Sequence, residues 1–212
     1  MRVIVADDDR LVCDSLRIIL GAQEGIEVCG IGSCGADALR LWQEVRPDVA
    51  LLDIQMPGSD GMWAAKRILA EDPGARVVFL TTFSDDEYIV RALKLGARGY
   101  LIKTDVAAIA PALEQVMAGR RVLEGKAIED VDLDAADASA APAGEAGPPA
   151  AFSCLTEREL EVARLVAEGL DNKEISSAAY MGEGTVRNHI SSILAKLGLR
   201  NRTQIAIAYL RG

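Results

Sequence analysis

The sequence predicts an α/β domain with a doubly wound, five-stranded parallel sheet, followed by a small all-α domain. Residues 1–120 alternate short β-rich apolar runs with longer amphipathic segments, which is the pattern of repeated βα units. Residues 124–151 are dominated by Ala, Pro, Gly and Asp, a composition typical of a flexible linker. Residues 152–212 show helical periodicity alone. We therefore expect domains at residues 1–122 and 152–212, joined by a linker at residues 123–151.

The expected strands are short apolar runs, and each is followed by an amphipathic segment of helical length. The strands are expected at residues 2–6, 27–31, 49–53, 77–81 and 99–102. The helices between and after them are expected at residues 11–20, 35–45, 61–70, 86–95 and 106–118. Asp9 directly precedes the first helix and is expected to cap it. In such folds, ligands bind beyond the carboxyl ends of the strands.

The tail begins with a helix-capping pattern. Thr156 and Glu159 have the spacing of a capping box, and Gly169 is placed to end the helix that follows. Further helices are expected at residues 172–179, 183–197 and 201–210. The tail is therefore predicted to be a bundle of four short helices.

Charge is distributed unevenly along the chain. The 212 residues include 23 basic and 32 acidic side chains, a net charge of -9, so the protein as a whole does not resemble a nucleic-acid binder. Residues 152–212, in contrast, hold 8 basic and 7 acidic side chains. Within them, residues 172–212 hold 6 basic and only 2 acidic groups, so the last three helices are the part suited to a phosphate backbone.

Other features of composition narrow the class of protein. No apolar run approaches the length of a transmembrane helix, and the N-terminus lacks a signal-peptide pattern. We therefore expect a cytoplasmic protein that does not associate with a membrane. The cysteines have neither CxxC nor metal-ligand spacing, so free buried or half-buried thiols are expected at Cys13, Cys29, Cys34 and Cys154.

Polar residues gather where the predicted strands end. Asp7 and Asp8 follow the first strand, and Asp53 closes the third. Such a carboxylate cluster would repel itself unless a hard divalent cation such as Mg2+ neutralised it. Thr81 and Lys103 end the fourth and fifth strands and are donors suited to phosphoryl oxygens. Asp53 would then be a nucleophile that forms an aspartyl phosphate.

Each of these residues also has a simpler interpretation when it is taken alone. An Asp after a strand is usually a turn or helix cap, Thr81 could simply end a strand, and Lys103 could be a solvated charge. The conjunction of all of them at one sheet edge favours the phosphoryl-transfer interpretation.

Four motifs form one recognisable set: Ala6-Asp7-Asp8, Leu52-Asp53-Ile54-Gln55-Met56-Pro57-Gly58 with Asp60-Gly61, Thr81-Thr82-Phe83, and Gly96-Ala97-Arg98-Gly99-Tyr100-Leu101-Ile102-Lys103. Through them, residues 1 to about 120 resemble the receiver domain of bacterial response regulators. The resemblance implies a flavodoxin-like fold in which Asp53 accepts a phosphoryl group from a sensor histidine kinase. One departure from the common pattern is Thr104, since many receivers have proline after the lysine.

The resemblance also assigns the ligands and the switch. It implies that Asp8, Asp53 and the backbone carbonyl of Gln55 hold Mg2+, with Asp7 helping mostly through water. Thr81 matches the switch hydroxyl, and Tyr100 matches the aromatic residue that changes rotamer when that threonine moves. The alternative for Tyr100 is an amphipathic side chain at a strand edge.

The tail carries a second set of motifs: Leu155-Thr156-Glu157-Arg158-Glu159, Gly169-Leu170-Asp171-Asn172-Lys173-Glu174-Ile175, Glu183-Gly184-Thr185-Val186-Arg187-Asn188-His189 and Leu194-Ala195-Lys196-Leu197-Gly198. These closely resemble the LuxR-type helix-turn-helix. The pairing of the two domains is similar to that of the NarL/LuxR-type response regulators, and it covers nearly the whole chain apart from the linker.

The spacing of the tail helices fits this resemblance. Helices at 172–179 and 183–197 are separated by a short turn, and the second would enter the major groove of DNA. The expected buried stripe of that helix is Val186, Ile190, Ile193, Leu194 and Leu197. Gly182 stands where Ser usually caps this helix, Ser191 where relatives often carry a basic residue, and His189 is not expected to be catalytic.

The expected DNA contacts lie on and beside the outer face of the recognition helix. Arg187 suits bidentate readout of guanine and Asn188 of adenine, and Ser191 shares their face. The remaining residues of the set are expected to anchor the phosphate backbone. These are Lys173, Thr185 and Lys196.

The function expected from both resemblances is that of a phosphorylation-switched transcription regulator. Its expected partners are a sensor histidine kinase, double-stranded promoter DNA and a second copy of the chain, with RNA polymerase as a further candidate. An atypical regulator that binds DNA without phosphorylation remains an alternative. A Mg2+-dependent phosphatase of the haloacid dehalogenase type is disfavoured, because Gln55 stands where that family needs a second aspartate.

Overall fold

The structure, a computed structural model, describes residues 1–82, 86–123 and 150–211. The chain divides into two compact units, and each is described by itself. The first comprises Met1–Ser84 and Leu95–Gly125, and the second Asp85–Lys94 and Lys126–Gly212. The linker predicted at residues 123–151 lies almost entirely outside the described residues.

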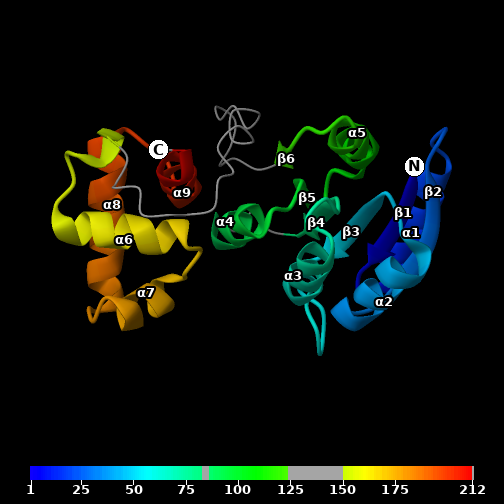
Figure 1. Ribbon diagram of the computed structural model, residues 1–212, viewed down its shortest axis with the longest axis horizontal. Helices are drawn as coiled ribbons and strands as arrows, with labels where there is room; N and C mark the ends of the chain where they lie inside the picture. Colours follow the sequence, from blue (N-terminus) through cyan, green and yellow to red (C-terminus); the bar gives the residue numbers. More distant parts are fainter. Residues whose placement is uncertain (83–85, 124–149, 212) are drawn as a thin grey trace. The chain divides into compact units, whose positions relative to one another are not determined.

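The first unit is built on one parallel sheet with the strand order β2-β1-β3-β4-β5-β6 (Figure 1). The strands are β1 (Arg2–Ala6), β2 (Glu27–Gly32), β3 (Val49–Asp53), β4 (Val77–Thr81), β5 (Gly99–Ile102) and β6 (Val122–Leu123). The predicted α/β fold and its five strands are confirmed. The short sixth strand was not predicted, because two apolar residues carry no periodicity.

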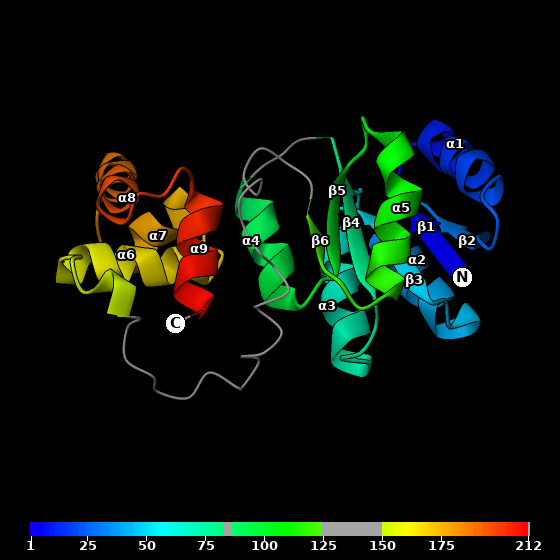
Figure 2. The same ribbon diagram turned by 90° about the horizontal axis from the view of Figure 1, so that it is seen from above.

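Helices cover both faces of this sheet (Figure 2). They are α1 (Arg10–Gly21), α2 (Gly35–Val45), α3 (Gly61–Glu71) and α5 (Val106–Met117). Residues from α1 and α5 share a core with Val5, Leu51 and Leu101 of the sheet. Side chains alternate along a strand, so Asp7, two residues beyond Val5, and Asp53, two beyond Leu51, fall on the same side.

Local contacts fix the loops that follow β1 and β3. Asp9 caps α1 as predicted, since its carboxylate accepts from the backbone N–H of Leu11 at 2.9 Å. At the start of α3, Gly61 donates its N–H to the carbonyl of Ile54 at 3.1 Å. A Cβ at Gly61 would lie 2.0 Å from the carbonyl oxygen of Asp53, so only glycine allows this close approach. The chain is thereby held tightly just after Asp53.

The second unit contains α4 (Asp86–Leu95), a 3-10 turn (Ala150–Phe152), α6 (Glu157–Ala167), α7 (Asn172–Ala178), α8 (Glu183–Leu197) and α9 (Arg202–Arg211). Its core is formed by buried residues that include Phe152, Val162, Val166, Ile175, Val186, Ile193 and Ile205. Val90 of α4 belongs to the same core. The predicted four-helix tail is confirmed, whereas the assignment of α4 to its core was not predicted.

The helix ends of the tail follow the predicted signals. The capping box at the start of α6 is present in both directions between Thr156 and Glu159. Gly169 has a φ of 81° and closes the turn after α6, as its position in the sequence predicts. Gly182 precedes α8 without a side-chain cap hydrogen bond.

Two predictions from composition can be compared with the described residues. None of the helices described here is long and apolar enough to cross a membrane. The cysteines are free thiols: Cys13 is buried, and Cys29 and Cys34 are half-buried, as predicted. The prediction of burial is wrong for Cys154, which is exposed because it lies in the short connection before α6.

Candidate functional site

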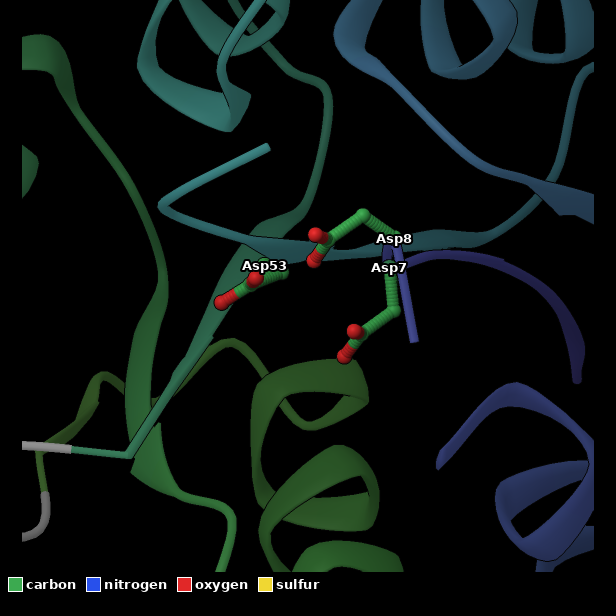
Figure 3. A group of neighbouring side chains, drawn as sticks. All are labelled: Asp7, Asp8 and Asp53. Carbon is green, nitrogen blue, oxygen red and sulfur yellow. The ribbon is translucent and has the colours of Figure 1, made fainter. Parts of the chain in front are cut away.

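Three carboxylates meet at the carboxyl edge of the sheet, where β1 and β3 end (Figure 3). Asp7, Asp8 and Asp53 each offer an oxygen, and these oxygens lie within 4.8 Å of one another. Asp7 and Asp53 are 2% and 6% exposed, whereas Asp8 is exposed to solvent. The cluster that the sequence predicted is therefore formed, with two of its members in the protein interior.

Lys103 joins two of these carboxylates. Its ammonium lies 2.7 Å from Oδ2 of Asp7 and 3.1 Å from Oδ1 of Asp53, and its side chain is only 13% exposed. Its backbone N–H donates to the carbonyl of Thr81 at 2.7 Å, which holds the end of β5 beside the end of β4. Sequence reasoning placed Lys103 at this edge but did not predict the double ion pair.

Burial and charge act on these groups in opposite directions. Burial raises the pKa of Asp53 above its usual value, and the ammonium of Lys103 only partly offsets this. For Lys103, burial lowers the pKa, but the hydrogen bond to Asp7 and the charge of Asp53 outweigh it, so the pKa is raised. The lysine is thus held charged.

The charges at this edge do not cancel. Among the described residues, one ammonium pairs with two of the three clustered carboxylates, so the cluster has an excess of two negative charges when all three are ionised. The oxygen donors of Asp7, Asp8 and Asp53 are the kind that Mg2+ prefers, and the exposed position of Asp8 leaves room for water ligands. Gln55 lies in the exposed loop after β3, two residues beyond Asp53. The residues present therefore fit a divalent cation.

Thr81 and Tyr100 lie on neighbouring strands. Thr81 closes β4 and is 7% exposed, and Tyr100 in β5 is fully buried. Tyr100 pairs with Phe79, two residues before Thr81, so the side chains of Thr81 and Tyr100 fall on the same side of the sheet. The full burial of Tyr100 and the position of β5 between β4 and β6 argue against the alternative of an amphipathic side chain at a strand edge.

The second unit contains the predicted helix-turn-helix, formed by α7, a short turn and α8. In the turn, the N–H of Met181 donates to the carbonyl of Ser176 at 3.1 Å, and the Ser176 hydroxyl donates to the carbonyl of Met181. Tyr180 has a φ of 53°, and the residue is 96% exposed. Sequence reasoning missed this left-handed residue, since Tyr rarely adopts such a conformation.

The two faces of α8 match the sequence pattern. Val186 and Ile193 are buried, and Ile190, Leu194 and Leu197 pack partly buried against the same core. The residues predicted to meet DNA are all exposed. On α8 they are Thr185, Arg187, Asn188, Ser191 and Lys196, and on α7 there is Lys173.

Lys196 differs from the others because it already has a partner. Its ammonium lies 2.6 Å from Oε2 of Glu159, whose side chain is only 6% exposed. The same carboxylate accepts from the Ser192 hydroxyl at 2.6 Å and from the backbone N–H of Thr156 at 2.8 Å. Glu159 thus ties the start of α6 to the last turns of α8. The capping-box spacing revealed its bond to Thr156, but nothing in the spacing revealed the bonds to α8.

Helix α4 is attached to the rest of the second unit by Arg91. The Nε of Arg91 donates to the carbonyl of Gly169 at 2.7 Å, and its guanidinium forms an ion pair with Glu174. A Cβ at Gly169 would lie 2.9 Å from Cγ of Arg91, so the side chain packs closely over this glycine. Val90 beside it is buried in the core of the unit.

Arg91→Ala is expected to loosen α4. The change removes a charge-assisted bond to the Gly169 carbonyl and an ion pair that is partly exposed, a loss of about 1–2 kcal/mol. Amide hydrogen exchange in α4 should therefore quicken roughly tenfold. Lys94→Ala, an exposed change in the same helix, is the control and should leave exchange unchanged. Equal exchange in both variants would mean that Arg91 does not hold the helix.

Comparison with known protein families agrees with the geometry of both units. Residues 3–114 match the model described as the response regulator receiver domain. Residues 153–209 match the model described as bacterial regulatory proteins, luxR family. A receiver domain followed by a LuxR-type helix-turn-helix in one chain defines a class of DNA-binding response regulators.

Curated relatives span the whole chain. The transcriptional regulatory protein LiaR of Bacillus subtilis is 40% identical over 208 residues, which cover 98% of this chain and 95% of LiaR. DesR of the same organism is 36% identical over 203 residues, covering 95% and 92%. DevR/DosR of Mycobacterium tuberculosis is 35% identical over 209 residues, covering 98% and 93%. This chain belongs to the LuxR-type family of two-component response regulators, which are DNA-binding transcription regulators, and the predicted NarL/LuxR-type resemblance is confirmed.

Solved structures share the fold. A two-component response regulator of the LuxR family from Aurantimonas sp. SI85-9A1 has a TM-score of 0.55 and 30% identity, covering 57% of this chain and 87% of its own. RcsB in the RcsB–DNA complex has a TM-score of 0.60 and 23% identity, covering 100% and 98%, and supports the fold alone.

Proposed function

We propose that Asp53 is the phosphoryl acceptor of this response regulator and that a sensor histidine kinase with Mg2+ supplies the phosphoryl group. The observation that carries the proposal is the uncompensated charge at the sheet edge: among the described residues, Lys103 pairs with the buried Asp7 and Asp53, and the exposed Asp8 adds a third carboxylate to the cluster. A site built only for stability would pair its buried charges fully, because an unpaired buried charge is costly. An excess of negative charge beside a solvent-accessible carboxylate suits the binding of a cation.

The chemistry assigned to Asp53 is nucleophilic. A carboxylate oxygen of Asp53 attacks the phosphorus, an acyl phosphate bond forms, and the bond from phosphorus to the donor group breaks, its electron pair leaving with the donor. Lys103 is positioned to turn toward the phosphoryl oxygens, since its ammonium already lies 3.1 Å from Asp53. Asp8, Asp53 and the carbonyl of Gln55, with Asp7, would hold Mg2+, which supplies charge stabilisation to the phosphoryl oxygens. We also propose self-catalysed hydrolysis at this site, in which water attacks the phosphorus, the acyl phosphate bond breaks, and the Asp53 carboxylate and inorganic phosphate are released.

The switch is proposed to begin at Thr81. Its hydroxyl would move toward the phosphoryl oxygens, and Tyr100, on the same side of the sheet, would change rotamer with it. Helix α4 begins five residues after Thr81, and Arg91 within it bonds to Gly169 and Glu174. A change at Thr81 would therefore shift α4, favouring dimerisation or release of the helix-turn-helix.

The proposed output is binding of promoter DNA by α8 in the major groove. The exposure of Arg187, Asn188 and Ser191 supports base contacts, and that of Lys173 and Thr185 supports phosphate contacts. The match of residues 153–209 to the luxR family of bacterial regulatory proteins supports this mode of binding. A phosphate contact by Lys196 would compete with its ion pair to Glu159, so we propose it as a weak one.

We further propose that two copies of the chain bind two half-sites. In the dimer, binding of one helical unit to its half-site would hold the helical unit of the other copy near the second half-site. The linkers would set the effective concentration for this second binding step. The proposed domain bounds are 1–122, 123–151 and 152–212, with α4 as the element shared between the switch and the helical unit. RNA polymerase remains a candidate partner at the promoter.

Phosphorylation with a small acyl phosphate and Mg2+, followed by measurement of DNA affinity, tests this function. An affinity at least tenfold higher is expected. An unchanged affinity would favour the alternative of a regulator that binds DNA without phosphorylation. The complete set of Asp7, Asp8, Asp53, Thr81 and Lys103 at one edge argues against that alternative. Gln55, in place of a second aspartate, argues against a phosphatase.

Arg187→Ala is expected to weaken binding of the preferred DNA by about 1–3 kcal/mol and to relax the preference at one base pair. The reason is that a bidentate contact to guanine is lost from the exposed face of α8. Lys173→Ala should instead weaken binding equally for all sequences. It should also reduce the slope of the logarithm of the binding constant against the logarithm of the salt concentration by about one. Binding to a set of DNA variants measures both effects. An unaltered sequence profile in Arg187→Ala would remove that residue from the base-reading set.

A further inference from the structure

The loop between β3 and α3 is bonded to the start of α2. Gly35, the first residue of α2, donates its N–H to the carbonyl of Ser59 at 2.7 Å, and Ala36 donates to the Ser59 hydroxyl at 2.8 Å. Cys34, which precedes α2, makes no side-chain cap hydrogen bond. The first N–H groups of a helix have no partner within the helix. Ser59 therefore supplies, from a distant loop, the acceptors that Cys34 does not.

The contact is so close that the helix side must be a glycine. A Cβ at Gly35 would lie 2.4 Å from the carbonyl oxygen of Asp60 and 2.9 Å from that of Ser59. Both distances are well inside the usual separation of non-bonded atoms, so a side chain at Gly35 would push the loop away. Gly35 is buried in this contact. The loop and α2 thus meet backbone to backbone.

The same loop, residues 54–60, carries Gln55, whose backbone carbonyl is proposed to hold Mg2+. Ile54 and Met56, on either side of Gln55, are buried, whereas Pro57 and Gly58 are exposed. After this exposed stretch, the bonds to Ser59 fasten the chain to α2. A loop fastened beyond Gln55 as well as before it leaves the carbonyl fewer positions to sample.

The position of this carbonyl matters because Mg2+ demands near-ideal octahedral geometry. Asp7 and Asp53 are buried and paired with Lys103, so they are held independently of the loop. Gln55 is exposed and depends on the loop that carries it. When only a fraction of molecules has the carbonyl in place, the apparent dissociation constant rises by the inverse of that fraction. Loosening residues 54–60 should therefore weaken Mg2+ binding.

We propose that Ser59 is a positioning residue for the divalent-cation site, which acts by fastening residues 54–60 to the start of α2. The inference rests on the proposed function for the assignment of the cation site, and it needs neither phosphoryl transfer nor DNA binding. The simpler alternative is that Ser59 only stabilises α2. The two roles differ in what they predict for Mg2+ affinity.

The test is a titration of the full-length protein with Mg2+ alone, followed through the backbone amide resonances of Asp8, Asp53 and Gln55. Ser59→Ala removes the hydroxyl that accepts from Ala36. The dissociation constant of Mg2+ should rise about threefold to tenfold, the range expected for the loss of one such hydrogen bond. Ser59→Thr keeps a hydroxyl at this position and should bind Mg2+ like the wild type.

Matched variants separate positioning from helix stability. Ser33→Ala removes a hydroxyl bond of 3.0 Å to Asp37 in the first turn of α2, and should leave Mg2+ binding unchanged. Gly35→Ala places a Cβ against the loop carbonyls and should weaken Mg2+ binding more than Ser59→Ala does. Its control is Gly21→Ala at the end of α1, where the added Cβ meets open space, and which should have no effect. Unfolding curves check that every variant is folded.

Each outcome of these titrations decides one point. Equal dissociation constants for the wild type and Ser59→Ala would overturn the positioning role and leave the proposed function standing, since labelling of Asp53 by an acyl phosphate measures that function separately. Equal weakening by Ser33→Ala and Ser59→Ala would assign Ser59 to helix stability alone and overturn the proposal. No saturable shift in the wild type would overturn the cation site together with this inference.

Discussion

Asp53→Asn is expected to abolish transfer of a phosphoryl group from a small acyl phosphate to this protein. The amide of Asn is a far weaker nucleophile than the carboxylate it replaces, and no acyl phosphate can form on it. The loss should exceed about a hundredfold in rate, which is the usual scale for removal of a nucleophile. The fold should persist, because the change keeps the shape of a side chain that is 8% exposed.

The measurement is intact-protein mass spectrometry after incubation with the acyl phosphate and Mg2+, followed by treatment with hydroxylamine, which cleaves acyl phosphates. The matched control is Asp14→Asn, because Asp14 lies on the exposed face of α1 and pairs only with the exposed Arg10 among the ion pairs described. The control should be labelled like the wild type. Equal labelling of Asp53→Asn and wild type would exclude Asp53 as the acceptor.

The geometry of the acidic edge could be predicted from the sequence because it follows from strand periodicity. Each short apolar run fixes where a strand ends, and parallel strands bring their carboxyl ends together. Asp7, Asp53 and Lys103 each follow a buried residue of the same sheet face by two positions, so their meeting is a consequence of the pleat. The pleat does not determine the distances between the side-chain atoms of these residues. The ion pairs of Lys103 could therefore be identified only from the structure.

Sequence patterns could not predict the contacts between elements that are far apart in the sequence. The periodicity of α4 correctly predicts a helix at residues 86–95, but it does not say which core receives Val90. The capping box predicts one partner of Glu159 and is silent on Lys196, which lies 37 residues away. The left-handed conformation of Tyr180 was missed for the opposite reason: local propensity argues against it, and the turn imposes it.

The buried carboxylates of the two units, Asp53 in the first and Glu159 in the second, have different surroundings. At Asp53, burial raises the pKa and the neighbouring charges remain uncompensated, which is suited to binding and chemistry. At Glu159, hydrogen bonds from Lys196, Ser192 and Thr156 lower the pKa to about 2, and the charge is fully satisfied. The second arrangement is suited to holding helices together. A substitution at Glu159 should therefore affect stability before it affects chemistry.

Glu159→Ala is expected to destabilise the second unit by about 2–4 kcal/mol, since it removes a helix cap and charge-assisted bonds at a buried carboxylate. Glu161→Ala, two residues along the same helix, loses only an ion pair with the exposed Arg158 and should cost about 0.5 kcal/mol or less. Trp42 and Trp63 both lie in the first unit, so tryptophan fluorescence does not follow this effect. Amide hydrogen exchange in α6 and α8 measures it instead.

The pH dependence gives the sharper test of the same carboxylate. Because the pKa of Glu159 falls from its usual 4.5 to about 2 on folding, the unfolded chain binds the proton more tightly. The stabilisation is therefore fully present above about pH 4.5 and is lost as the pH falls toward 2. Glu159→Gln carries no such charge, so the difference in stability between wild type and Glu159→Gln should shrink across this window, whatever other carboxylates do in both proteins. A difference that stays constant between pH 5 and pH 2.5 would show that the charge of Glu159 does not hold α6 to α8, and that Lys196 is free to meet a DNA phosphate.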